Sequence, residues 1–249
     1  MYKALIAETI RYAGHGGDEI EAYYARPLGP GPYPGVLVIH HMPGWDDATK
    51  EIARRFADEG YAAISPHLFH REGGGTAKPE DASAAARAAG GVPDERFLGD
   101  AAGAIAYLRS QLYTSHKVGV IGYCSGGRQS YIAGCRLPVD AVVDCYGGRV
   151  VASADELSPN QPMAPIDMTP DLRCPILGLF GVEDQNPSQE HVKLITEALE
   201  ANNKTYEFQS YENAGHSFFS VDRPSYRPEA AVDGWNRIFE FYGRYLKEG

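Results

Sequence analysis

The chain of 249 residues is poor in cysteine, in basic residues and in long apolar runs. Its 4 cysteines include no Cys-x-x-Cys pair and are too sparse for a disulfide framework. Lys and Arg number 23 against 33 Asp and Glu, and no stretch concentrates them, which argues against a nucleic-acid partner. No apolar run approaches membrane-spanning length, and Glu8 and Arg11 interrupt the start before a secretory segment forms. We therefore expect a soluble, cytoplasmic protein with reduced thiols that binds neither nucleic acid nor membrane.

The apolar pattern alternates between strand-like and helix-like segments along the whole chain. It predicts a hairpin from 4–12 and 19–26, strands at 35–40, 61–65, 116–121, 139–145, 175–180 and 205–211, and helices at 46–59, within 79–112, and at 126–134, 187–201 and 228–247. Such alternation is typical of an α/β fold with a mainly parallel central sheet and helices on both faces. The length suits one domain over residues 1–249. Residues 149–173, rich in proline, are interpreted as a structured crossover or a cover over the site rather than a domain linker.

One start signal stands out among these helices. Asn186 precedes Pro187, and a Gln follows at 189, so the pattern predicts that Asn186 caps the helix over 187–201 with proline at its first position.

The sequence Gly-Tyr-Cys-Ser-Gly at 122–126 directly follows the apolar run at 118–121. A nucleophile at a sharp turn from strand to helix needs small neighbours, because its backbone is strained and the chain packs closely on both sides. Gly122 and Gly126 meet that need. The amides of the following helix favour a thiolate at Cys124, which predicts that this thiol is the nucleophile. The competing interpretation is a buried, inert cysteine in a glycine-rich turn.

Two further polar residues follow predicted strands, where the functional residues of parallel sheets collect. Asp184 follows the strand at 175–180, and His216 follows the strand at 205–211. The order Cys, Asp, His is that of the α/β-hydrolase triad, in which the base takes the nucleophile's proton and the acid orients the base. Glu183 is the rival of Asp184, and a purely structural histidine is the alternative for His216.

Acyl transfer also requires donors for the developing oxyanion. The Ser125 amide is the natural first donor. The second is expected from the turn after the strand at 35–40, where Pro43 has no N–H; this leaves Met42, with His41 as its rival.

These segments together resemble the dienelactone hydrolase family of α/β-hydrolases. The match rests on Gly-Tyr-Cys-Ser-Gly-Gly at 122–127, Gly-Val-Glu-Asp at 181–184 and Tyr-Glu-Asn-Ala-Gly-His-Ser-Phe at 211–218, and it extends over nearly the whole chain. The resemblance implies a triad of Cys124, His216 and Asp184 that hydrolyses a small-molecule ester or lactone through an acyl-thiol intermediate, without metal or organic cofactor. The protein is expected to be a monomer or homodimer.

The chain departs from the family at two positions. The residue aligned with the family's cysteine-activating glutamate is His41, a second base that would leave the Cys124 thiolate more permanently formed. Ser220 stands where the family has an arginine that clamps the substrate carboxylate. Candidates to replace that arginine are Arg71, Arg128, Arg149 and Arg223.

Substrate contacts are expected from residues near the strand ends. The candidates are His41, Trp45, Tyr146 and Ser217, with Phe218 and Phe219 as further apolar walls, although aromatics in such places are as often core. A metal site from His40, His41, His67 and His70 is disfavoured, because adjacent extended residues point to opposite sides. The remaining alternatives are a hydrolase of thioesters or phosphotriesters, and a slow ligand-binding or redox-sensing protein on the same fold.

Overall fold

The computed structural model describes residues 4–73 and 78–247, and the chain forms two compact units, Met1–Gly119 and Val120–Gly249. Strand β5 (Thr114–Tyr123) crosses the boundary between them. The predicted strands and helices are found, with ends that shift by a few residues. A single domain over residues 1–249 stays a prediction.

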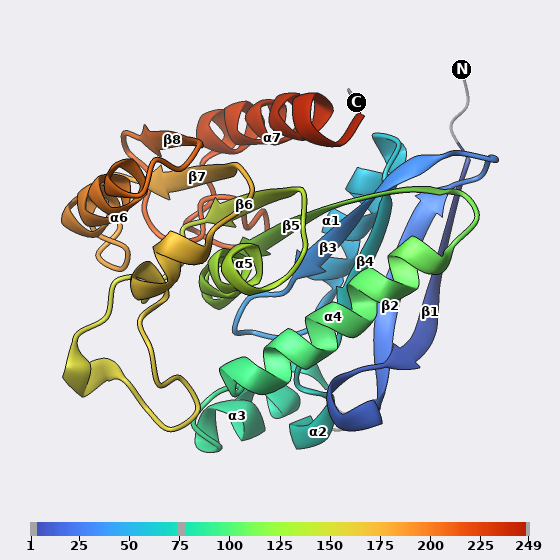
Figure 1. Ribbon diagram of the computed structural model, residues 1–249, viewed down its shortest axis with the longest axis horizontal. Coiled ribbons are helices and arrows are strands. Elements are labelled where there is room, and N and C mark those ends of the chain that lie inside the picture. Colours follow the sequence, from blue (N-terminus) through green and yellow to red (C-terminus); the bar gives the residue numbers. More distant parts are fainter. Residues whose placement is uncertain (1–3, 74–77, 248–249) are drawn as a thin grey trace. The chain divides into compact units, whose positions relative to one another are not determined.

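The first unit begins with the predicted hairpin, and its strands follow the order β1-β2-β4-β3. Its elements in chain order are β1 (Leu5–Ala13), β2 (Glu19–Pro27), β3 (Tyr33–Ile39), α1 (Asp47–Asp58), β4 (Ala62–Pro66), α2 (His70–Gly73), α3 (Pro79–Ala88) and α4 (Asp94–Ser110). β2 runs antiparallel to β1 and β4, whereas β3 and β4 are parallel. Helices α1 and α4 both pack on these strands, on opposite faces in Figure 1. The apolar residues of β3 are therefore buried on both sides.

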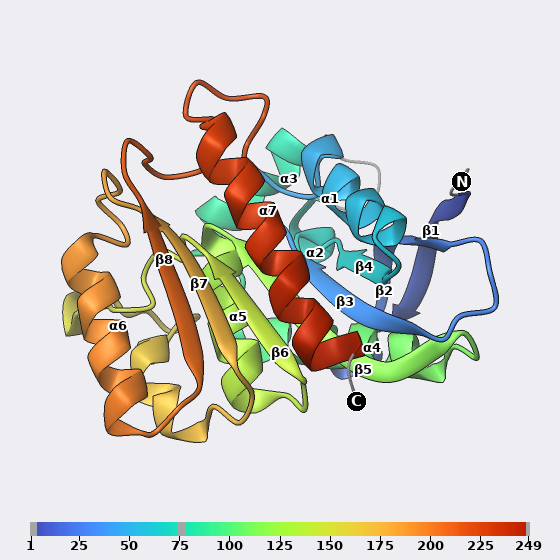
Figure 2. The same ribbon diagram turned by 90° about the horizontal axis from the view of Figure 1, so that it is seen from above.

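The second unit continues from the end of β5 with the strand order β5-β6-β7-β8. Its elements are α5 (Ser125–Arg136), β6 (Ala141–Cys145), β7 (Ile176–Gly181), α6 (Gln189–Ala201), β8 (Tyr206–Tyr211), α7 (Pro228–Tyr242) and a π-helical turn (Gly243–Lys247). Strands β6, β7 and β8 are parallel, α5 packs on β6, and α7 packs on β7 (Figure 2). The carboxyl ends of these strands lie along one edge of the sheet. The loops that follow them there are where functional residues of parallel sheets collect.

The segment at 149–173 is structured, as predicted. It contains the short 3₁₀ helices Ala154–Glu156 and Pro165–Asp171, and the second packs against α5 and α6. Tyr131 on α5 is hydrogen-bonded to Thr169 through their hydroxyls, 2.6 Å apart. Its function as a cover stays a prediction.

The predicted start of α6 is wrong by two residues. The helix begins at Gln189, and Ser188 is its cap, with its hydroxyl accepting from the His191 amide at 3.2 Å. Asn186 is engaged elsewhere: its amide donates to Asp184 Oδ1 (2.9 Å), and its side-chain oxygen accepts from the Arg149 amide (3.0 Å). Because its side-chain oxygen accepts from the Arg149 amide in another loop, Asn186 does not cap the helix.

Candidate active site

Cys124 lies between β5 and α5 with a left-handed backbone, at φ 57° and ψ −118°. This conformation is strained for a residue with a side chain and persists only where the surroundings impose it. The Cys124 amide donates to the Cys145 carbonyl on β6 (3.0 Å), and the Cys124 carbonyl accepts from the amides of Gly127 (3.0 Å) and Arg128 (3.3 Å). These bonds fix the turn and leave the thiol partly exposed.

Glycine is required just before this turn. A Cβ on Gly122 would lie 1.8 Å from the Gly126 carbonyl oxygen, a distance that no side chain tolerates. The strand and the first turn of α5 thus approach each other as closely as the 122–126 motif predicts.

His216 and Asp184 are brought together by the loops after β8 and β7. His216 Nδ1 lies 2.7 Å from Asp184 Oδ2. The Asp184 side chain is only 3% exposed, whereas the His216 ring is 35% exposed and Glu183 lies in solvent. The Asn186 amide holds the other Asp184 oxygen at 2.9 Å. Of the two rival carboxylates, Asp184 is therefore the one hydrogen-bonded to the imidazole.

The electrostatics of His216 depend on both neighbours. Burial lowers the pKa of His216, but hydrogen bonds to Asp184 and to Cys124, and the charges of both, raise it to about 10. Since Nδ1 faces Asp184, Nε2 is the ring nitrogen left for Cys124. The three residues form a chain from acid to base to thiol.

Tyr146 packs beside this chain. It has φ 44°, its ring centroid lies 5.2 Å from that of His216, and it is buried. Burial raises the pKa of Tyr146 well above its usual value, and its hydroxyl is hydrogen-bonded by the Ser220 side chain and the Phe219 backbone. Phe218 is fully buried and 5.2 Å from the Tyr146 ring, which makes it a core residue.

Ser217 immediately follows His216 and is also buried. Its φ of 65° turns the chain sharply at this point. Contact of Ser217 or Tyr146 with substrate stays a prediction.

The other predicted site residues belong to the first unit. His41 Nε2 lies 2.6 Å from Asp46 Oδ2, and the Met42 carbonyl accepts from the Ser83 hydroxyl at 2.7 Å. Trp45 donates to the Ser65 carbonyl at 2.9 Å. The imidazole of His41 is thus already partnered with a carboxylate. Its predicted effect on Cys124, the Met42 oxyanion donor and the Trp45 contact stay predictions.

The pairing with His41 also shifts the pKa of Asp46. Burial raises the pKa of its carboxyl, but the His41 imidazole and the Thr49 amide lower it to about 2.

The histidines weighed as metal ligands have other partners. His40 Nδ1 lies 2.8 Å from the His41 carbonyl, and Nε2 accepts from the Leu68 amide at 3.2 Å. Burial lowers the pKa of His40 to about 3, so its ring is neutral. Within residues 4–73 and 78–247, no three His, Cys, Asp or Glu side chains are grouped for a metal ion.

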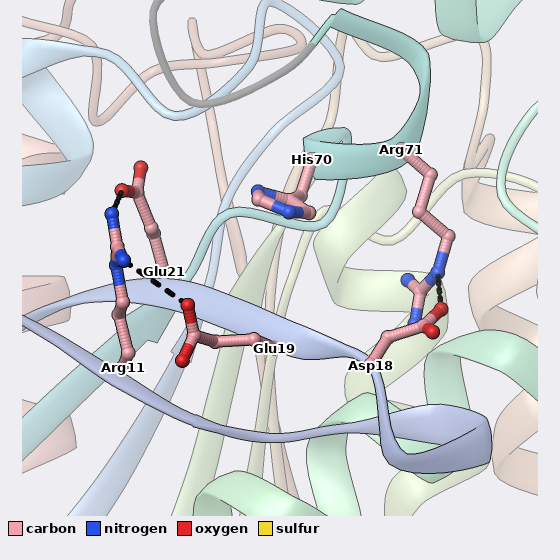
Figure 3. Close-up of a pocket in the computed structure, with 6 residues that line it drawn as sticks. All are labelled: Arg11, Asp18, Glu19, Glu21, His70 and Arg71. Carbon is pink, nitrogen blue, oxygen red and sulfur yellow. Dashed lines mark hydrogen bonds and ion pairs between the residues drawn. The ribbon is translucent and has the colours of Figure 1, made fainter.

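A polar cavity of about 540 Å³ lies in the first unit (Figure 3). Its lining residues are Arg11, Asp18, Glu19, Glu21, His70 and Arg71. The charges pair among themselves: Arg11 binds Glu19 and Glu21, and Arg71 binds Asp18 at 2.7 Å. Arg71 also holds the buried Asp100 at 2.8 Å. Arg71 is therefore already neutralised, which weakens it as a substrate clamp.

Asp144 is a further residue near the site, and it is not among those predicted from the sequence. It is 1% exposed within β6, and its Oδ1 accepts from the Gly147 amide at 2.7 Å. The available signal was a carboxylic acid in the apolar run Ala-Val-Val-Asp-Cys, where an ionisable side chain is out of place.

The model of the dienelactone hydrolase family matches residues 20–246. The chain belongs to this family. It is 35% identical over 92% of its length to a protein of Salmonella typhimurium assigned as a carboxymethylenebutenolidase, of which it covers 84%. It is also 29% identical to a Bradyrhizobium protein assigned as a 2-oxo-3-(5-oxofuran-2-ylidene)propanoate lactonase, over 94% of this chain and 92% of that protein.

Solved structures agree with the family. The crystal structure of a protein assigned as a dienelactone hydrolase from Klebsiella pneumoniae matches with a TM-score of 0.88 and 33% identity, over 97% of this chain and all of that one. This dienelactone hydrolase family member accordingly has the α/β-hydrolase fold and is a carboxylic ester hydrolase. None of its helices, in the part of the chain described, is both long and apolar enough to cross a bilayer.

Proposed function

We propose that this dienelactone hydrolase family member cleaves an ester or lactone through an acyl-thiol intermediate on Cys124. The observation that carries the proposal is His216, which is hydrogen-bonded to Asp184 on one side and to Cys124 on the other. The relatives assigned as carboxymethylenebutenolidases and as a lactonase support this substrate class.

The reaction has two steps. The Cys124 thiolate attacks the carbonyl carbon, the carbon–oxygen bond to the leaving group breaks, and the leaving oxygen takes the proton from His216. His216 then removes a proton from water, which attacks the thioester, and the acid leaves as the thiolate re-forms. Asp184 holds the imidazole in the required tautomer and balances its positive charge.

The developing oxyanion is held by backbone amides in this proposal. Ser125 is the first residue of α5, and first-turn amides of a helix have no partner within the helix. Its N–H is thus available to the oxyanion and adds the favourable end of the helix dipole. Met42 remains the predicted second donor.

The proposed location is the cytoplasm, as the sparse cysteines predict. All four are free thiols in the structure. A thiolate nucleophile is retained most readily where the environment is reducing.

Hydrolysis of p-nitrophenyl acetate and of a small lactone tests the proposal. We expect Cys124→Ala to lower kcat by roughly 10³-fold or more, while Cys174→Ala, which removes a buried thiol, retains wild-type activity. Acid quenching during turnover should trap one acyl group on the peptide that contains Cys124. Equal rates in wild type and Cys124→Ala would exclude the thiol as nucleophile. If turnover occurs only with thioesters or phosphotriesters, the ester proposal is wrong.

A further inference from the structure

The first turn of α5 and the turn after β6 meet at a single buried carboxyl group. Asp144 Oδ1 accepts from the Gly147 amide at 2.7 Å. A Cβ on Gly127 or on Gly147 would lie 2.4 Å from the same oxygen. Both glycines are therefore needed to let the carboxyl enter between the two turns.

Each of these turns carries part of the candidate active site. The α5 turn begins at Cys124, whose amide donates to the Cys145 carbonyl, the residue after Asp144. The β6 turn carries Tyr146, whose amide donates to the Leu179 carbonyl and whose ring packs on His216. Asp144 thus lies at the point where the supports of the thiol and of the base come together.

The same turn also reaches the acid. Arg149 donates its amide to the Asn186 side chain at 3.0 Å, and the Asn186 amide donates to Asp184 at 2.9 Å. The short segment from Asp144 to Arg149 is therefore connected to all three members of the proposed triad.

We propose that Asp144 is a positioning residue, whose buried side-chain oxygen binds the turn that carries Tyr146 and packs against the first turn of α5, and so keeps Cys124 and His216 aligned. It does not touch the reacting atoms. The inference rests on the proposed function, since alignment matters only if these two residues react together.

The presence of an acid at this buried position is itself informative. Burial raises the pKa of the Asp144 carboxyl to about 7, a cost that an alanine or valine in this strand would avoid. The Gly147 amide offsets part of that cost. The hydrogen bond, rather than packing, is what only an oxygen-bearing side chain provides here.

Asp144→Asn and Asp144→Ala separate these contributions, with Asp155→Ala on the exposed 3₁₀ helix as control. Asparagine keeps an oxygen for the Gly147 amide, so we expect kcat within about threefold of wild type. Alanine removes it, and we expect kcat to fall about tenfold or more with KM nearly unchanged, because small misplacements of reacting groups are costly. If the alanine variant does not fold, Asp144→Val, which retains much of the side-chain volume but has no acceptor for the Gly147 amide, takes its place.

A second readout needs no substrate. Iodoacetamide should alkylate Cys124 selectively, because the other three thiols are buried, and peptide mass identifies the product. The alkylation rate reports how well the Cys124 thiol is aligned with His216. In Asp144→Ala the alkylation rate should fall, as kcat does. In Asp144→Asn it should return to near the wild-type rate. Folded Asp144→Ala with wild-type kcat and alkylation rate, or an asparagine variant as impaired as the alanine one, would overturn the inference. A failure of the proposed function would instead show in the Cys124→Ala comparison.

Discussion

Burial of Asp144 in β6 raises the pKa of its carboxyl from 3.8 to about 7, because the charged form loses its hydration. The Gly147 amide lowers the pKa only in part. The nearby ionisable groups that respond to its charge, Tyr131 on α5 and Cys145 on β6, both have raised pKa values and are neutral at pH 7. Asp144 therefore titrates close to neutral pH on its own.

This pKa sets the direction of a pH effect on stability. A carboxyl that binds its proton more tightly in the folded state stabilises that state below pH 3.8, and the contribution is lost as the pH rises through about 7. Between pH 5 and pH 8.5 we expect Asp144→Asn to gain up to about 3 kcal/mol in unfolding free energy relative to wild type. Urea unfolding at both pH values measures the difference.

Asp155→Asn is the control for this experiment. The pKa of Asp155, which is exposed, is lowered by the Ser153 side chain, so the group stays ionised across the whole range. The difference in unfolding free energy between Asp155→Asn and wild type should be the same at both pH values. A wild-type-like pH profile in Asp144→Asn would show that Asp144 does not titrate near neutrality.

At the scale of elements, the close approach of β5 and α5 determines where the thiol is placed. Gly122 has no room for a side chain, since its Cβ would meet the Gly126 carbonyl oxygen. The strand must therefore move, or the helix must start later, if this glycine is replaced. Either change displaces Cys124 from His216.

We expect Gly122→Ala to lose esterase activity and to lower the unfolding free energy by about 1–3 kcal/mol, as overpacking does in rigid cores. Gly243→Ala is the matched control, because a Cβ there meets nothing within 4 Å and its φ of −55° is helical. That variant should be neutral or gain about 0.5–1 kcal/mol. Urea unfolding and ester hydrolysis of both variants decide the point, and an active, stable Gly122→Ala would contradict it.

At the scale of the whole molecule, β5 belongs to both compact units, with the boundary between Gly119 and Val120. A strand that two units share links the unfolding of one to that of the other. We therefore expect one cooperative thermal transition, with coincident changes in far-ultraviolet dichroism and tryptophan fluorescence. Two separated transitions would show that the units fold independently and would contradict the prediction of a single domain.

The sequence by itself determined the α/β class, the approximate strand and helix positions and the hydrolase family. Local signals carry this information: the apolar runs of β3 and β7, the glycines around Cys124, and the polar residues placed directly after strands. The family resemblance, confirmed by the comparison, follows from the same three motifs.

Only the tertiary structure decided which of several equivalent groups is used. Asp184 rather than Glu183 faces His216, because the loop after β7 buries one carboxylate and exposes the other. Ser188 rather than Asn186 caps α6, because the Asn186 side-chain oxygen accepts from the Arg149 amide in a distant loop. Asp144 packs against the first turn of α5 through a contact of the same long-range kind. These choices depend on residues distant in the chain, whose contacts no local pattern contains.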